Sequence, residues 1–268
     1  RARDLLQARG IVPVLLKVGS FLLRHSPVDL GVRAMADFDL LVGPEPFDEA
    51  FAALSEAGWR RASPELQFSS RVAPAVTLVT KDAGGVAVQI DLHRHLAQWP
   101  LLKEMPARVV AGAEAPGGWH LPSLLHAALV VGLHRTRHAF ANDARDLTDL
   151  AVTSSTLTDE LWGDVVREAR LLGLTGALYA VVRQAAWWFG SDGDALTTRA
   201  VALRARLGGL RVALLDRMAA PAFALTLSSP WSGPLGRNFG VFPAAFHSPV
   251  RSVVAAMVFL PRRVVERR

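Results

Sequence analysis

The sequence predicts an α+β protein in which a small mixed β-sheet domain is followed by a C-terminal helical domain. Two features of the chain support this prediction. Short apolar runs that end at glycine or proline, as strands do, are concentrated in the first hundred or so of the 268 residues. From Pro122 onward, apolar residues recur at helical spacing instead, with few strand signals. We therefore predict two domains, residues 1–115 and residues 116–268.

The first predicted unit consists of a strand, a tight turn and a helix. Residues 4–9 are typical of the end of a short helix, and residues 12–17 form a short apolar run of strand type. Gly19 and Ser20 interrupt this run, and residues 21–25 resume at helical spacing. This order predicts a turn at Gly19 and Ser20. The backbone N–H groups and the positive end of the helix would then point at whatever lies in the turn.

A second strand, a helix and a hairpin are predicted next. Residues 37–42 alternate charged and apolar side chains and then run apolar until Gly43, which indicates a strand. Residues 46–58 have the apolar spacing of an amphipathic helix. Residues 76–80 and 86–92 flank a short glycine-containing segment, which predicts a β-hairpin.

The second half of the chain is predicted to be helical. A segment that contains Pro116, Gly117 and Gly118 separates it from the first half and marks the expected domain boundary. The predicted helices are residues 124–137, 144–152, 159–172, 176–189 and 195–218.

Composition narrows the classes of site and partner. The chain has no cysteine, which excludes disulfides, iron–sulfur clusters, thiolate zinc sites and cysteine nucleophiles. Any metal must be held by oxygen or imidazole, which favours a hard ion such as Mg²⁺. The formal net charge is +6, carried mostly by arginine, and we interpret it as a solvated basic surface, so nucleic acid is not the favoured partner. No apolar stretch reaches the roughly 18 residues of a spanning helix, and we expect a cytoplasmic protein without a transmembrane segment.

Three aspartates are the candidate catalytic and metal-binding residues. Asp37 and Asp39 lie two residues apart on a predicted strand, so both carboxylates point to one face of the sheet while Phe38 and Leu40 face the core. Two like charges on one face repel unless a cation lies between them. Asp91 lies among apolar residues on a later strand. If the two strands are neighbours, three carboxylates converge on one spot, which suits a magnesium site.

A magnesium site of this kind also uses phosphate oxygens of the substrate. Gly19 would let the backbone approach a phosphate closely, and the hydroxyl and N–H groups of Ser20 could bind its terminal oxygens. Lys17 and Arg33 could neutralise the remaining charge. His93 would share the face of Asp91 and is an acid–base or phosphate-binding candidate.

This order of motifs resembles that of the polymerase-β-like nucleotidyltransferase superfamily. More narrowly, it is similar to the bacterial uncharacterised nucleotidyltransferase family. The resemblance is detailed over about the first hundred residues and loose over the helical remainder. It is carried by residues 15–20, 33–42, 57–59 and 90–93.

The resemblance implies a role for each part of the site. Gly19 and Ser20 would form the phosphate loop, Asp37 and Asp39 the metal pair, and Asp91 the third carboxylate, close to the acceptor oxygen as a base or a metal ligand. The implied ion is Mg²⁺ or Mn²⁺.

The implied reaction is transfer of a nucleoside monophosphate, AMP from ATP, to a hydroxyl or similar acceptor with release of pyrophosphate. The acceptor could be a small molecule, a protein side chain or a nucleic acid end, and the helical domain would close over it. Two alternatives remain open. One is a toxin–antitoxin component that modifies its partner protein, and the other is a catalytically degenerate binding module.

Two further groups lie on predicted helices. His134 and His138 are one helical turn apart and could hold zinc, but no glutamate lies between them in the metalloprotease arrangement, so structural packing is favoured. Trp187, Trp188 and Phe189 could stack on a base, although aromatic residues on a helix are more often part of the core.

Overall fold

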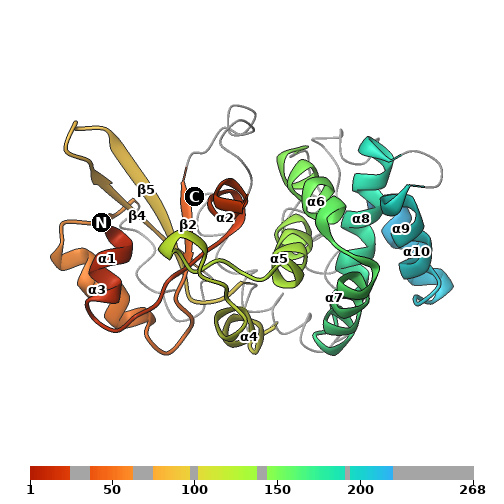
Figure 1. The fold of residues 1–268 in the computed structure, drawn as a ribbon, viewed down its shortest axis with the longest axis horizontal. Helices are drawn as coiled ribbons and strands as arrows, with labels where there is room; N and C mark the ends of the chain where they lie inside the picture. Colours follow the sequence, from red (N-terminus) through yellow and green to blue (C-terminus); the bar gives the residue numbers. More distant parts are fainter. Residues whose placement is uncertain (25–36, 63–74, 97–101, 138–143, 191–193, 220–268) are drawn as a thin grey trace, which may run out of the picture. The chain divides into compact units, whose positions relative to one another are not determined.

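A computed structural model describes residues 1–24, 37–62, 75–96, 102–137, 144–190 and 194–219 of the chain (Figure 1). Arg33 and His138, which the sequence analysis singled out, lie outside these residues. The chain divides into two compact units between Ser123 and Leu124. The two domains expected from the sequence, with a boundary after residue 115, stay a prediction.

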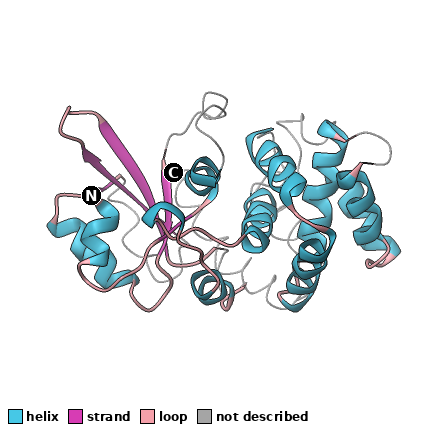
Figure 2. Cartoon of the chain, in the orientation of Figure 1, coloured by secondary structure: helices cyan, strands magenta, loops and turns pink. Residues whose placement is uncertain are grey.

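The first unit is built on a five-stranded sheet with the strand order β1-β2-β5-β4-β3. β2 and β5 pair in parallel, and the other neighbouring strands pair antiparallel. The predicted mixed sheet is therefore confirmed, and among the described residues strands occur only in this unit (Figure 2). The strands are β1 (Val14–Leu15), β2 (Phe38–Leu41), β3 (Arg60–Arg61), β4 (Ala75–Lys81) and β5 (Ala87–His93).

Helices surround this sheet and make up the second unit. The short strand β3 and the helix α4 were not predicted from the sequence. The predicted helix 195–218 is two helices, separated just before Gly209, where adjacent glycines disfavour helix formation.

The helices of the first unit are α1 (Ala2–Gln7), α2 (Lys17–Arg24), α3 (Phe47–Glu56) and α4 (Met105–Ala111), with a 3₁₀ turn at Pro116–Gly118. Those of the second are α5 (Leu124–Arg137), α6 (Ala144–Thr156), α7 (Asp159–Leu171), α8 (Thr175–Phe189), α9 (Ala195–Arg204) and α10 (Gly209–Ala219).

One prediction about the first unit is wrong. Gly19 and Ser20 do not form a turn before a helix, because α2 already begins at Lys17 and contains both residues in its first turn. The chain instead turns at Lys17, whose φ of 47° lies in the left-handed region. Gly19 serves close packing, since a Cβ atom there would lie only 2.6 Å from Cδ1 of Leu15 in β1.

The apolar core of the first unit lies on one face of the sheet. Leu40 of β2 and Leu92 of β5 are buried there against Leu6 of α1 and against Phe47 and Leu54 of α3. This confirms the alternation predicted for β2, in which the residue after each aspartate faces the core. In Figure 1, α1 and α3 lie on this side of the strands and α2 lies on the other. The opposite face is thus left for polar side chains.

The hairpin of β4 and β5 fixes which residues face one another on that polar side. Its strands pair from Ala75 with His93 to Lys81 with Ala87. In the turn between them, a side-chain oxygen of Asp82 accepts hydrogen bonds from the backbone N–H groups of Gly84 and Val86, at 2.9 and 2.8 Å. The predicted hairpin is confirmed, and the pair of Lys81 with Ala87 closes its five-residue turn.

The second unit is organised around α8, which packs against α5, α6, α7, α9 and α10. Most of α8 is buried, but its last three residues are not: Trp187, Trp188 and Phe189 are 49%, 48% and 47% exposed. The expectation that these aromatic residues belong to the core is wrong, because about half of each side chain is exposed at the C-terminal end of α8. Among the described residues, no helix combines the length and the apolar character that a membrane crossing requires.

Candidate metal and nucleotide site

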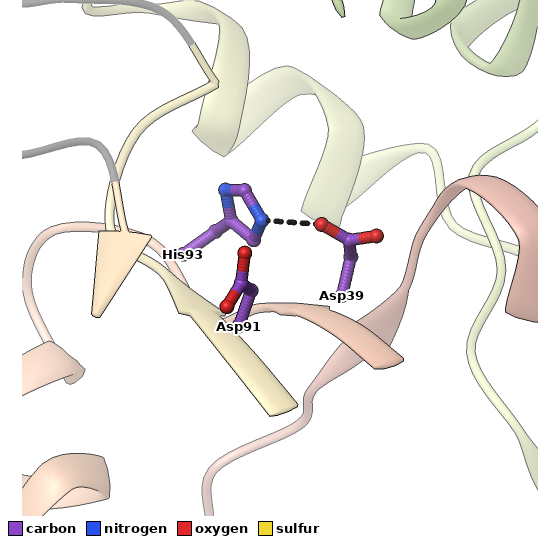
Figure 3. A group of neighbouring side chains, drawn as sticks. All are labelled: Asp39, Asp91 and His93. Carbon is purple, nitrogen blue, oxygen red and sulfur yellow. Dashed lines mark hydrogen bonds and ion pairs between the residues drawn. The ribbon is translucent and has the colours of Figure 1, made fainter. Parts of the chain in front are cut away.

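Asp39 and Asp91 face each other across two neighbouring parallel strands. The register of β2 and β5 pairs Asp39 with Asp91, as it pairs Leu40 with Leu92 on the core side. Neighbouring strands lie about 4.8 Å apart and cross-strand partners share a face, so both carboxylates point away from the core. The adjacency on which the predicted carboxylate site depended is therefore present, and Figure 3 shows the two side chains together.

His93 joins the two aspartates in one cluster. One potential ligand atom from each of Asp39, Asp91 and His93 lies within 4.8 Å of the others. Asp39 is 4% and His93 is 2% exposed, and Asp91 is half-buried. The two carboxylates are ligands that suit Mg²⁺ or Mn²⁺, whereas an imidazole is more often a ligand of ions such as Zn²⁺.

A single oxygen of Asp39 accepts two hydrogen bonds. The Nζ atom of Lys17 lies 2.6 Å and Nε2 of His93 lies 2.8 Å from Oδ1 of Asp39. Burial alone would raise the pKa of Asp39, but the hydrogen bond and charge of His93, and then those of Lys17, hold this pKa well below its ordinary value. Asp39 is therefore a carboxylate at neutral pH. Nδ1 of His93, on the far side of the ring, has no hydrogen-bond partner among the described residues.

The pKa of Asp37 is shifted in the opposite direction to that of Asp39. It lies directly before β2 and is half-buried. Its pKa is raised, first by burial and then by the negative charges of Asp39 and Asp91. The repulsion that the sequence predicts between these carboxylates is thus present in the fold. Asp37 is not part of the cluster of mutually close ligand atoms, and its role as a metal ligand stays a prediction.

A further residue, Thr77, was not predicted from the sequence. Its hydroxyl donates a hydrogen bond of 2.7 Å to Oδ1 of Asp91. Thr77 lies directly opposite Asp91 in the β4–β5 ladder. The signal was weak, because Thr77 stands in a run of strand residues whose partners depend on the register of the hairpin.

The first turn of α2 begins beside Asp39. The backbone N–H of Leu16 donates to the carbonyl oxygen of Asp39 at 2.9 Å, and Lys17 pairs with its side chain. The N–H groups of a first helical turn have no partners inside the helix, which favours an anion nearby.

Ser20 is buried, and its hydroxyl donates to the carbonyl oxygen of Lys17 at 2.8 Å. While this bond holds, the hydroxyl can accept but not donate a hydrogen bond. The phosphate-binding roles of Gly19 and Ser20 stay predictions, and Arg33 lies outside the described residues.

Comparison with known protein families decides what kind of protein this is. A model of the uncharacterised nucleotidyltransferase family matches residues 1–190. The chain belongs to this family. It is a nucleotidyltransferase, an enzyme that transfers a nucleoside monophosphate from a nucleoside triphosphate. No curated protein matches the chain significantly.

The family match reaches further than the sequence motifs indicated. Those motifs end at residue 93, whereas the match includes α5 to α8 of the nucleotidyltransferase and ends just after α8. In this helical part, Nδ1 of His134 lies 2.7 Å from Oδ2 of Asp146. His134 is thus held by a carboxylate from α6, and the structural role favoured for it stays a prediction. The zinc pair with His138 involves a residue outside the described part of the chain.

Proposed function

We propose that this nucleotidyltransferase transfers AMP from ATP to a hydroxyl or similar acceptor, releases pyrophosphate, and depends on Mg²⁺ or Mn²⁺ held by Asp37, Asp39 and Asp91. The observation that carries the proposal is the in-register pairing of Asp39 with Asp91 on neighbouring parallel strands, beside the first turn of α2. A bound divalent ion would supply positive charge to the triphosphate and to the departing pyrophosphate.

The chain's own cations complement that charge. Lys17 stands at the start of α2 with its ammonium group beside the carboxylates. From there it can reach an anion that binds at the same face, while the N-terminal end of α2 adds its partial positive charge. His93 holds Oδ1 of Asp39 from the other side, which fixes the orientation of that carboxylate.

The proposed reaction forms one bond and breaks one. The acceptor oxygen bonds to the α-phosphorus of ATP, the bond from that phosphorus to the bridging oxygen of pyrophosphate breaks, and the acceptor gives up its proton. Asp91 is the residue that we propose near the acceptor oxygen, as the base for this proton or as a ligand. It is half-buried, and it is the least buried member of the cluster.

The catalytically degenerate alternative loses support from the same geometry. It would be favoured by a third carboxylate more than roughly 8 Å from the others, because one magnesium site could not then use them together. For two of the three carboxylates this condition is not met, since ligand atoms of Asp39 and Asp91 lie within 4.8 Å of each other, whereas Asp37 is not in that group. A partner protein as the acceptor, as in a toxin–antitoxin pair, remains compatible with this chemistry.

The direct test is to incubate the purified protein with each of the four nucleoside triphosphates and Mg²⁺ or Mn²⁺ and to measure pyrophosphate release. Triphosphates labelled at the α-phosphate, added with a cell extract, would reveal the acceptor as the labelled species. We expect release with ATP, loss of release when the divalent ion is chelated, and restoration when it is added back.

Asp39→Asn and Asp91→Asn should abolish the signal because each removes a charged oxygen ligand. Glu49→Gln is the matched control, since Glu49 is an exposed acidic residue on α3 in the same unit. Pyrophosphate release that persists in both site variants would overturn the proposed function.

A further inference from the structure

The polar face of the sheet carries a row of three side chains across three strands. Asp39 of β2 is paired with Asp91 of β5, and Asp91 is paired in turn with Thr77 of β4. Cross-strand partners point to the same face. Asp91 therefore lies between a carboxylate on one side and a hydroxyl on the other, and only the hydroxyl can donate a hydrogen bond to it.

We infer that Thr77 is a positioning residue for Asp91, a role that rests on the proposed function of that carboxylate. Its hydroxyl lies 2.7 Å from Oδ1 of Asp91 and belongs to the strand next to it. Thr77 has no charge and is not one of the clustered ligand residues. It acts on the site through Asp91 alone.

Such a hydroxyl would orient the carboxylate of Asp91. A carboxylate that ends a short side chain rotates freely about its last bond unless one of its oxygens is held. The bond from Thr77 holds Oδ1 of Asp91, which leaves the other oxygen for an ion or an acceptor proton.

The β-branched shape of threonine makes this arrangement more rigid. Threonine has few χ1 states on a strand, and its methyl group packs against its neighbours whichever residue its hydroxyl contacts. Replacement by valine keeps that shape and removes only the donor. Thr77→Val therefore separates the hydrogen bond from the packing of β4.

The test measures the affinity for Mn²⁺ directly, by titration of the free ion signal in paramagnetic resonance, in the full-length protein without nucleotide. We expect Thr77→Val to weaken Mn²⁺ binding by about 10- to 100-fold, the effect typical of residues that orient metal ligands. Thr77→Ser, which restores the hydroxyl, should bind close to the wild-type value. Thr80→Val is the matched control: Thr80 lies on β4 three residues away, on the other face, opposite Val88.

Asp91→Asn in the same titration distinguishes this inference from the proposed function. If Asp91→Asn weakens binding and Thr77→Val does not, Thr77 has no positioning role and the proposed metal site stands. If Asp91→Asn binds Mn²⁺ as the wild type does, both the metal role of Asp91 and the role of Thr77 are wrong. Equal weakening by Thr77→Val and Thr80→Val would also overturn the inference, because the loss would then reflect the strand rather than the hydroxyl.

Discussion

Nζ of Lys17 lies 2.6 Å from Oδ1 of Asp39, and this ion pair joins the first residue of α2 to the middle of β2. The carboxylate is almost fully buried, and the lysine side chain is 17% exposed. An ionised carboxylate so far from water needs a partner. Lysine provides that partner from a left-handed backbone conformation, which is uncommon for a residue other than glycine. The ammonium group thus contacts the oxygen that a divalent ion would also use.

Substitutions at Asp39 should separate catalysis from folding. Asp39→Asn keeps the shape and an acceptor oxygen but removes the charge. We expect a loss of activity of more than about 100-fold, beyond the effect typical of residues that only support a ligand. Asp39→Ala should in addition lower the free energy of unfolding by up to about 3 kcal/mol, because it leaves a partly buried ammonium group unpaired. Pyrophosphate release and urea unfolding of both variants check this, and equal stability of the two would contradict it.

The ammonium group of Lys17 should compete with a metal ion for Asp39. Lys17→Met removes the charge at nearly constant length. In the absence of nucleotide we expect the dissociation constant for Mn²⁺ to fall by up to about tenfold, which corresponds to about 1.4 kcal/mol. The KM for the triphosphate should rise, since a phosphate partner is lost.

Lys81→Met, at the exposed end of β4, is the control for Lys17→Met and should change neither value. Weaker Mn²⁺ binding in Lys17→Met would show that the lysine supports the ion rather than competing with it.

Asp37→Asn should stabilise the protein when no divalent ion is present. The pKa of Asp37 is raised in the fold, so its carboxylate is less favourable there than in the unfolded chain. Below the unfolded pKa of about 3.9 the group is protonated in both states, and no penalty exists. The penalty appears as the pH rises above the unfolded pKa and is complete once the pH exceeds the raised folded pKa.

Thermal unfolding of metal-free protein at neutral pH should therefore give a higher Tm for Asp37→Asn than for the wild type. Added Mn²⁺ should raise the Tm of the wild type more than that of the variant, because an ion that binds only the folded state stabilises it. The same ranking of the two proteins with and without the ion would argue against a role for Asp37 at the metal site.

Tyr179 should make the second unit sensitive to alkaline pH. Burial, and then the hydrogen bond and charge of Asp216, raise the pKa of Tyr179 to about 12. The folded state thus keeps the phenol proton at a pH where the unfolded chain loses it, above about 10. The stability that Tyr179 provides is fully present below about pH 10 and is lost as the pH rises towards 12, by about 2.7 kcal/mol at most.

Tyr179 is the single tyrosine of the chain, so phenolate absorbance reports its ionisation without overlap. Urea unfolding between pH 9 and 12 should show a steeper loss of stability for the wild type than for Tyr179→Phe, in which the lysine titrations remain. A phenolate transition near pH 10 in the folded protein would contradict the raised pKa.

Much of the fold follows from local pattern. The alternation around Asp37 and Asp39 predicted a strand with carboxylates on one face, and the structure has β2 there with Leu40 in the core. Helical spacing predicted most helices of the second unit to within a few residues, because their apolar residues recur at the helical period. The extents of α9 and α10 differ since adjacent glycines divide what the pattern presented as one helix.

The side-chain contacts of the site were harder to predict from the sequence, because they depend on the register of the hairpin. Pairing Thr80 with Val86, the ends of the predicted strands, would have placed Ala75 opposite Asp91. The ladder instead pairs Lys81 with Ala87, and this shift of two residues places Thr77 there. The shift preserves the face of every side chain, so no hydrophobic pattern distinguishes the two registers. The turn formed by Asp82 decides between them.

By itself, the sequence determined which carboxylate and basic side chains the site contains and which strands carry the carboxylates. The reason is that a strand with one buried face alternates polar and apolar residues, and this pattern can be read locally. Only the tertiary structure decided that Asp39 meets Asp91 and that Lys17, rather than a glycine turn, contacts Asp39. Both depend on pairing between segments far apart in the chain. The physical reason is that many pairings bury the same apolar faces, and the packing of the whole unit selects one of them.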